Sequence, residues 1–273
     1  DPDELAIQWF DRWLKGIDNG VESTPPVRAF VMGENRWREA KDWPLPGTEF
    51  TKYYLNSNGD ARLKNGGGEL TAKPGASQGS DHYVYDPGNP TPGDGELDET
   101  FEPVGRDLTP RQLRDDVLIY TTPPLDASVE VTGPLSAVIY FSTSAPSTDL
   151  ILRLVDVHPD GKAYSVFNTS TAIPYRSHWS DVSETKADGS TIIRAEMILP
   201  PTSIVFKTGH RIRVSVSSAA APVYRGLNVE PGTEATAMTW NIARQEIIHD
   251  ESHPSHIVLP VISSIAEGGD NEH

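Results

Sequence analysis

Residues 149–168 read DLILRLVDVHPDGKAYSVFN, and this stretch decides the fold. A mostly apolar run, Asp149–His158, is followed by the turn residues Pro159-Asp160-Gly161 and then by a second strand-like run, Lys162–Asn168. Gly161 tolerates the positive φ that a tight turn requires. A nearly continuous apolar run is typical of a strand buried inside a sandwich. The sequence therefore predicts a hairpin here.

Similar strand-like runs recur on both sides of this hairpin. Gly and Pro, at 22 and 23 residues, divide the chain after Thr24 into short segments rich in Val, Ile and Tyr. With the hairpin included, the expected strands are Val27–Met32, Phe50–Leu55, His82–Tyr85, Val117–Thr121, Ser128–Thr132, Ser136–Ser142, Asp149–His158, Lys162–Asn168, Ile192–Ile198, Arg211–Ser217 and Ser255–Val261. Strands at this spacing predict an all-β fold, a jelly-roll-like antiparallel sandwich of two sheets over residues 27–273. Long loops are expected at Asn56–Ser80 and Asp86–Asp116.

One amphipathic helix is expected ahead of the sandwich, from Asp1 to about Lys15. Pro2 suits the first helical position, acidic residues follow it, and Gly16 supplies a stop. The apolar face of this helix is made of Leu5, Trp9, Phe10, Trp13 and Leu14. This is more apolar surface than a solvated helix carries, so we expect an interface here. Residues 1–26 are expected to form a helix and linker separate from the sandwich.

Composition excludes several classes of partner. With 39 Asp and Glu against 23 Lys and Arg, the formal charge is −16, and no basic footprint for nucleic acid is present. No apolar window reaches the roughly 18 residues of a membrane-spanning helix, so no membrane partner is expected. The absence of cysteine removes disulfides and thiolate metal sites. It is compatible with the cytoplasm and with export, and of the two we favour the cytoplasm.

The segment Gly75-Ala76-Ser77-Gln78-Gly79 matches the G-x-S-x-G nucleophile motif of hydrolases. That motif requires a buried strand before the serine and a helix after it. Here Lys73-Pro74 precedes the motif, and a further strand is expected after it. We therefore assign no catalytic role to Ser77.

Histidine and carboxylate residues gather near the end of the chain, where His249, His253 and His256 flank Asp250 and Glu251. Such side chains suit zinc or another divalent ion, but Pro254 interrupts the spacing of a ligand-bearing helix. The segment Asp156-Val157-His158-Pro159-Asp160 presents a similar choice, and a hairpin end explains it better than a site. The sequence gives no reason to expect a metal or another cofactor.

Tryptophans outside the helix could form a sugar-stacking platform on the sandwich. These residues are Trp37, Trp43, Trp179 and Trp240. Packing in a core or an interface is the commoner fate of tryptophan, and the sequence does not separate the two roles.

The order of motifs along the chain resembles a known family, the C-terminal non-catalytic domain of serine hydrolases of the X-Pro dipeptidyl-peptidase and cocaine esterase type. The resemblance covers nearly the whole chain. The matching stretches are Trp9-Phe10-Asp11-Arg12-Trp13-Leu14-Lys15-Gly16, Val27-Arg28-Ala29-Phe30-Val31-Met32-Gly33, Trp37-Arg38, Trp43-Pro44, Tyr85-Asp86-Pro87, Arg114-Asp115-Asp116-Val117-Leu118, Val131-Thr132-Gly133-Pro134, Leu154-Val155-Asp156-Val157-His158-Pro159-Asp160-Gly161, Gly209-His210-Arg211-Ile212 and His253-Pro254-Ser255-His256-Ile257-Val258-Leu259-Pro260.

The resemblance implies a galactose-binding-like jelly roll that packs against an α/β-hydrolase domain. In such proteins that other domain carries the catalytic Ser, Asp and His, so none of the three is expected in this chain. The opening helix then corresponds to the last helix of the hydrolase domain, and the sequence to a piece of a longer protein. A loop at about Pro92–Leu113 is implied to approach the substrate, with Leu97 and Phe101 as its expected apolar contacts.

The function expected on these grounds is that of an accessory domain, inactive alone, which shapes the substrate cleft of a hydrolase. The resemblance leaves open whether the whole protein is an esterase, an amino-ester hydrolase or a dipeptidyl-peptidase. Its expected partner is the hydrolase domain, and a second copy could pair through the helix. Two alternatives remain at this point, a free-standing carbohydrate-binding module and a small complete hydrolase that uses Ser77.

Overall fold

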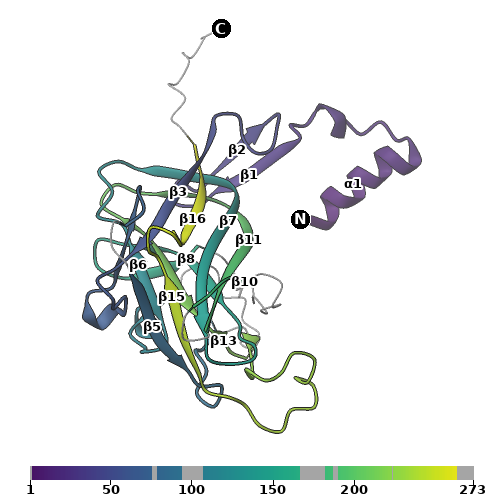
Figure 1. Cartoon of the computed structure of the whole chain (residues 1–273). Coiled ribbons are helices and arrows are strands. Elements are labelled where there is room, and N and C mark those ends of the chain that lie inside the picture. The colour runs from purple at the N-terminus through teal and green to yellow at the C-terminus, as the bar shows by residue number, and fades with distance from the viewer. Residues whose placement is uncertain are drawn as a thin grey trace.

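The structure is a computed structural model of the whole chain, and it describes residues 2–75, 79–93, 107–166, 182–186, 190–222 and 224–262. Two antiparallel hairpins accompany one large sheet in this part of the chain. Figure 1 shows the strands gathered into one β body, with α1 (Pro2–Lys15) standing to one side of it. The expected mostly-β sandwich preceded by one helix is confirmed. In the described residues no helix is long and apolar enough to span a bilayer.

The large sheet has 12 strands within the described residues. They are β3 (Thr48–Asn56), β4 (Gly68–Thr71), β5 (Ser80–Tyr85), β6 (Leu118–Thr121), β7 (Val129–Thr143), β8 (Ile151–Val157), β9 (Ala163–Ser165), β10 (Val182–Thr185), β11 (Thr191–Phe206), β12 (Arg211–Ser217), β15 (Ala243–Ile248) and β16 (His256–Ile262). The hairpins pair β1 (Val27–Val31) with β2 (Arg36–Ala40) and β13 (Ala219–Ala220) with β14 (Tyr224–Arg225). Short helical turns are η1 (Val21–Ser23), η2 (Leu63–Asn65) and α2 (Thr109–Gln112).

The order of the strands explains the sandwich. It runs β10-β11-β7-β16-β3-β4-β6-β12-β8-β9, with β15 pairing with β7 and β5 beside this path. The neighbours pair antiparallel except β4 and β6, which are parallel. Strands from both halves of this order bury side chains in one core. Phe141 of β7, Tyr120 of β6 and Leu154 of β8 are buried in the same apolar cluster.

Strand β7 joins two runs that the sequence predicts as separate strands, Ser128–Thr132 and Ser136–Ser142. Gly133 and Pro134 lie inside one long strand. The register with β11 shifts between Leu199 and Thr202, which pair with Leu135 and Gly133. A bulge accommodates the missing N–H of proline, and glycine is needed because a Cβ at Gly133 would come within 2.7 Å of Pro260. The predicted break is therefore a bulge.

The predicted loops were wrong in part. Asn56–Ser80 contains η2 and β4, and Asp86–Asp116 contains α2. Five further strands were not predicted, namely β2, β10, β13, β14 and β15. Their sequences are polar or short, and β15 is held by main-chain pairing with neighbours on both sides, β5 and β7. Pairing with neighbouring strands can stabilise a strand whose own residues have little preference for β structure.

The β1–β2 hairpin attaches the N-terminal region to the sandwich. Main-chain hydrogen bonds join the Met32 amide to the Ser203 carbonyl at 3.0 Å and the Val205 amide to the Met32 carbonyl at 2.9 Å. Gly33 fits against this junction with a φ of 86°, because a Cβ there would lie 2.6 Å from the Val205 carbonyl oxygen. The hairpin is therefore fixed against β11, and α1 lies upstream of this attachment.

Candidate functional site

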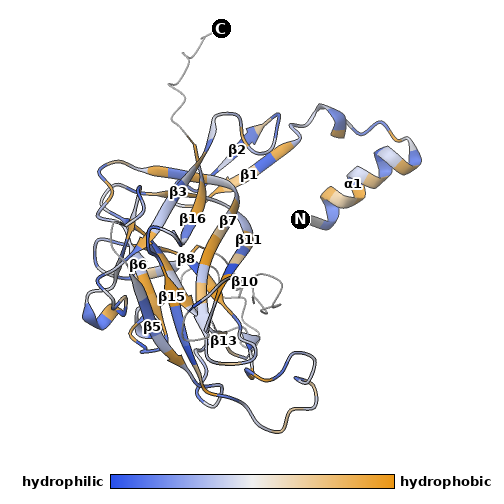
Figure 2. Cartoon of the chain, viewed as in Figure 1, coloured by the Kyte–Doolittle hydropathy of each residue, from blue (hydrophilic) through white to orange (hydrophobic). Residues whose placement is uncertain are grey.

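Among the helices of the described residues, α1 carries the most exposed apolar side chains. Its exposed members are Leu5, Ile7, Trp9, Phe10, Trp13, Leu14 and, just after the helix, Ile17, and we call this set the α1 face. Each is at least 47% exposed, and Leu14 is 77% exposed. Figure 2 shows hydrophobic positions along α1, which stands clear of the strands. All five residues predicted for the interface helix therefore lie on the α1 face.

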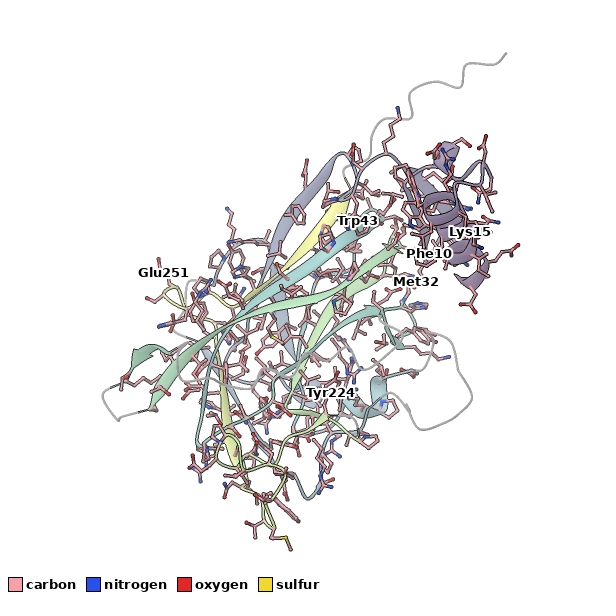
Figure 3. The ribbon with its side chains drawn as sticks, turned by 90° about the vertical axis from the view of Figure 1, so that its right-hand side faces the viewer. Phe10, Lys15, Met32, Trp43, Tyr224 and Glu251 are labelled. Atoms are coloured by element: carbon pink, nitrogen blue, oxygen red, sulfur yellow. The ribbon has the colours of Figure 1, made fainter. Side chains whose placement is uncertain are left out.

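Local contacts keep α1 helical without covering the α1 face. Acidic residues in the first turn and Lys15 in the last turn both favour the helix dipole. Arg12 pairs with Glu22 at 2.8 Å, and the Asn19 side-chain amide donates to the Gln8 carbonyl at 2.7 Å. These contacts tie the segment after the helix to its polar side. In Figure 3, which views the molecule from the side on which α1 lies, Phe10 and Lys15 can be located on the helix.

Two tryptophans form the centre of the α1 face. The rings of Trp9 and Trp13 lie one helical turn apart, with centroids 5.7 Å apart and planes at 52°. Arg12 lies over the Trp13 ring at 5.9 Å. Burying one large apolar side chain contributes about 1.5–3 kcal/mol, so covering several of them favours association strongly. The α1 face has the chemistry of a protein-binding surface.

The serine considered as a nucleophile, Ser77, lies outside the described residues. Another serine does lie beside a histidine and an aspartate: Ser57 Oγ is 3.3 Å from His249 Nε2 and donates to Asp81 Oδ1 at 2.6 Å. Asp81 Oδ2 is 2.9 Å from the same His249 nitrogen. In a catalytic triad the acid and the serine bond to opposite nitrogens of the ring. Here both bond to Nε2, so Ser57 has no general base.

The buried Asp81 and His249 instead form a structural group, which sequence reasoning missed. Asp81 and His249 are 0% and 2% exposed. Tyr120 donates its hydroxyl to Asp81 Oδ2 at 2.8 Å. Burial raises the pKa of Tyr120 well above its ordinary value, and the nearby Asp81 charge raises it further, so the hydroxyl stays protonated as a donor. The group links β5, β6 and the residue that follows β15.

The histidines near the chain end are not brought together. His253 Nδ1 lies 3.0 Å from Asp250 Oδ1, and His256 Nδ1 lies 2.7 Å from the Pro254 carbonyl. Each of these rings has a partner of its own, and His249 lies in the buried group. Within the described residues, the histidines and carboxylates that do come together in a ligand-like group are Asp156, His158 and His210.

Among the tryptophans outside the helix, Trp37 and Trp240 do not share one platform, Trp43 is 43% exposed, and Trp179 lies outside the described residues. Trp37 packs edge-on against Phe30, with centroids 5.4 Å apart. Trp240 donates its indole N–H to Asp86 at 3.2 Å. Strand β2, which carries Trp37, and the loop before β15, which carries Trp240, lie at opposite ends of the molecule (Figure 1).

In the loop expected to approach a substrate, Leu97 and Phe101 lie outside the described residues, whereas residues 92–93 and 107–113, which include α2, are described. Its two flanks are joined on the sandwich. Thr91 donates to Asp116 Oδ2 at 2.8 Å, and Arg114 donates both to Asp116 and, at 2.8 Å, to the Asn89 carbonyl. These hydrogen bonds join residues 89–91 to residues 114–116.

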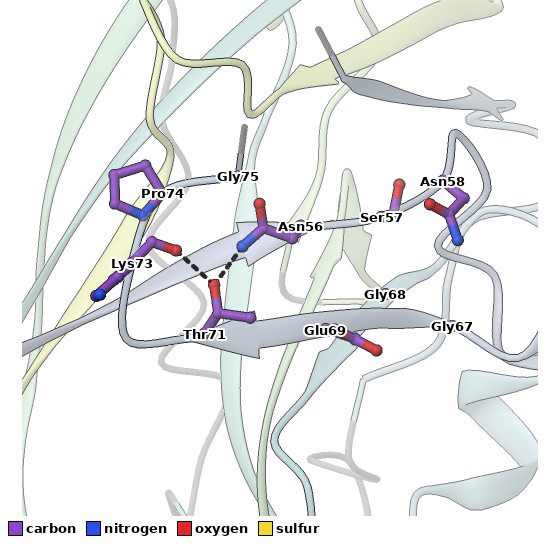
Figure 4. Close-up of a pocket in the computed structure, with 10 residues that line it drawn as sticks. All are labelled: Asn56, Ser57, Asn58, Gly67, Gly68, Glu69, Thr71, Lys73, Pro74 and Gly75. Atoms are coloured by element: carbon purple, nitrogen blue, oxygen red, sulfur yellow. Dashed lines mark hydrogen bonds between the residues drawn. The ribbon is translucent and has the colours of Figure 1, made fainter. Parts of the chain in front are cut away.

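A polar pocket of about 380 Å³ lies between the end of β3 and β4 (Figure 4). Its lining side chains partly engage one another, since Asn56 donates to the Thr71 hydroxyl and Thr71 donates to the Lys73 carbonyl at 2.6 Å. With no aromatic ring among its lining residues, the pocket lacks a stacking surface for a sugar. It does not favour the carbohydrate-binding alternative.

Comparison with known proteins places the chain in a family. The profile of the X-Pro dipeptidyl-peptidase C-terminal non-catalytic domain matches residues 19–258. The chain is 39% identical over 258 residues to the cocaine esterase of Rhodococcus sp. (strain MB1 Bresler). That match covers 93% of this chain and 45% of the esterase, so the chain spans less than half of that relative's length.

Solved structures show the same fold in larger proteins. An aminopeptidase from a Thaumarchaeota archaeon matches with a TM-score of 0.73 and 24% identity, over 94% of this chain and 43% of that one. An α-amino acid ester hydrolase matches with a TM-score of 0.70 and 23% identity, over 93% of this chain and 44% of the other. In each case this chain corresponds to one part of a longer chain. The chain belongs to the family of X-Pro dipeptidyl-peptidase C-terminal non-catalytic domains.

Proposed function

We propose that this chain is the accessory domain of a serine hydrolase that cleaves an ester or an amide, that it binds the α/β-hydrolase domain of that enzyme, and that it has no hydrolase activity alone. The single observation that carries the proposal is the α1 face. Six large apolar side chains of the helix, and Ile17 just after it, are exposed to solvent. A hydrolase domain of the kind implied by the family resemblance would cover this face.

Two parts of the chain have different tasks in this proposal, the α1 face and the loop that contains Leu97 and Phe101. The α1 face supplies the contact with the hydrolase domain, and its two central tryptophans supply most of the affinity, because large aromatic side chains dominate such interfaces. The loop with Leu97 and Phe101 then shapes the cleft over the catalytic serine. The hydrogen bonds from Arg114 to the Asn89 carbonyl and from Thr91 to Asp116 support this loop by joining its flanks.

The 39% identical relative makes an ester the substrate class we favour. The relative with 39% identity is a cocaine esterase, and one matching structure is an α-amino acid ester hydrolase. Acyl transfer requires a nucleophile, a general base and an orienting acid. The Ser57 group lacks that arrangement, so these three groups are assigned to the hydrolase domain.

The chain alone is expected to leave a generic nitrophenyl ester unhydrolysed and to remain unlabelled by a fluorophosphonate probe. Nucleophile activation requires an adjacent base, and the sequence around Ser77 does not provide the context for one. The measurement compares the wild-type chain with Ser77→Ala and Ser57→Ala, using an active serine esterase as the positive control. Stoichiometric labelling that disappears in either variant would show that the chain is itself a hydrolase and would overturn the proposal.

A further inference from the structure

One group of ligand-type side chains lies outside both the α1 face and the buried Asp81 group. Asp156 is near the end of β8, His158 immediately follows β8, and His210 immediately precedes β12. These two strands pair antiparallel, with Ile212 opposite Asp156 and Arg211 opposite Val157. Continuing the register by one residue places His210 opposite His158. Residues on alternate positions of a strand share a face, so the three side chains project from the same side of the sheet.

The ligand atoms already converge. His210 Nδ1 lies 2.9 Å and 3.1 Å from the two carboxylate oxygens of Asp156, and His158 Nε2 lies 3.3 Å from Asp156 Oδ2. One oxygen or nitrogen from each of the three residues lies within 4.8 Å of the others. Two ligand atoms each at about 2.0–2.1 Å from a tetrahedral Zn²⁺ lie about 3.3 Å apart. The separations between Asp156 and each histidine are close to that spacing, and the ligand atoms of the two histidines lie within 4.8 Å of each other.

We propose that Asp156, His158 and His210 form a binding site for a divalent transition-metal ion, with Zn²⁺ the best fit. Two neutral imidazoles and one carboxylate are ligands that Zn²⁺ accepts readily, whereas Ca²⁺ and Mg²⁺ prefer oxygen ligands. Three protein ligands leave one position for water. The His158 side chain is 39% exposed, and the side chains of Asp156 and His210 are each 12% exposed, so the site is held by the sheet and open to solvent at one ligand.

The surrounding backbone fixes these ligands before any metal arrives. The His158 amide donates to the Lys162 carbonyl at 2.9 Å, and the Gly161 amide donates to the His158 carbonyl at 2.9 Å, which closes the β8–β9 turn. The Tyr164 ring packs against His158 with centroids 4.6 Å apart. A bound ion would join the turn to β12, since its ligands come from both.

The test titrates Zn²⁺ into the chelator-treated full chain by calorimetry, with Co²⁺ as a spectroscopic probe. We expect one Zn²⁺ per chain and visible absorption from Co²⁺ in a low-coordinate nitrogen and oxygen site. His158→Ala should weaken binding at least about tenfold, because even the loss of a supporting partner of a ligand costs that much. Asp156→Asn should have the same direction of effect. His82→Ala, at an exposed histidine on β5, is the matched control and should leave binding unchanged.

The outcomes separate a metal site from a hydrogen-bonded cluster. The proposal is wrong if the wild-type chain binds no Zn²⁺, or if it binds Zn²⁺ with equal affinity after His158→Ala and Asp156→Asn. Circular dichroism of each variant shows whether it has folded. If Asp156→Asn unfolds, the more exposed His158 variant and the Co²⁺ spectrum of the wild-type chain still decide between the two cases. None of these measurements depends on hydrolase activity.

Discussion

Replacing Trp9 and Trp13 together by glutamate is expected to weaken binding of the chain to a hydrolase domain at least about 100-fold. Truncating a tryptophan at the centre of an interface typically costs about 2 kcal/mol or more, and every 1.4 kcal/mol is about tenfold in affinity. The two rings lie 5.7 Å apart on the α1 face and are each 54% exposed, so they are available to a partner. Glutamate also places two charges where the partner surface must be apolar.

The binding partner for this measurement is the part of the Rhodococcus cocaine esterase that the chain does not match. Fluorophosphonate labelling of that part shows that it is folded, and calorimetry gives the dissociation constant. The control variant is Ile198→Glu/Met238→Glu, which makes the same charge change at two residues that are 79% and 94% exposed outside α1. Equal affinity of the wild type and the tryptophan variant would rule out the α1 face as the docking surface.

Self-association supplies a second readout of the same substitution. Without a hydrolase domain, we expect the α1 face to pair with that of a second copy, while the charge of −16 opposes larger aggregates. Sedimentation at micromolar concentration should therefore show association of the wild-type chain, a monomer for the tryptophan variant and association of the control variant. If the wild-type chain is monomeric at all concentrations, pairing between copies is excluded.

Asp81→Ala is expected to lower the free energy of unfolding by about 3–5 kcal/mol, which is the usual cost of removing one partner from a buried polar or ionic pair. The substitution leaves the Tyr120 hydroxyl and the His249 ring without their shared acceptor inside the sandwich. It also creates a cavity at a fully buried position. Because Asp81, Tyr120 and His249 come from distant parts of the chain, the loss should reduce the cooperativity of folding across the sandwich.

Urea unfolding followed by tryptophan fluorescence measures this effect. Asp81→Asn retains the size and one acceptor oxygen and should cost less than Asp81→Ala. Asp126→Ala, at an exposed carboxylate, is the matched control and should change the free energy of unfolding by less than about 0.5 kcal/mol. An Asp81→Ala variant as stable as the Asp126→Ala control would contradict the role assigned to the buried group.

Local sequence patterns predict the elements that are specified by their own residues. The β8–β9 hairpin follows from its apolar run and its Pro-Asp-Gly turn, and α1 follows from its periodicity and from Gly16. Strand β15 could not be predicted in this way, because Arg244, Gln245 and Glu246 are polar and the strand is held by its position between β5 and β7. Tertiary pairing outweighs local preference there.

The candidate site residues also differ in whether the sequence alone can reveal them. The α1 face is visible in the sequence because its members recur at helical spacing within a single element. The Asp156, His158 and His210 group is not, because it depends on the register between β8 and β12, which the sequence does not reveal. The same holds for Asp81 and His249, which lie on or beside neighbouring strands far apart in the chain. The sequence signal for this group was the predicted turn after β8, where Asp156 and His158 lie close together. The third residue, His210, lies far away in the sequence.

The central claim is that the chain acts as a non-catalytic accessory domain through the α1 face. Its most direct test is the rate at which the hydrolase part of the Rhodococcus cocaine esterase cleaves a nitrophenyl ester, measured alone and with increasing amounts of this chain. The account predicts that the wild-type chain raises the rate up to one chain per hydrolase part, and that Trp9→Glu/Trp13→Glu does not. A rate that stays unchanged when the wild-type chain is added, or that both chains raise equally, would contradict it.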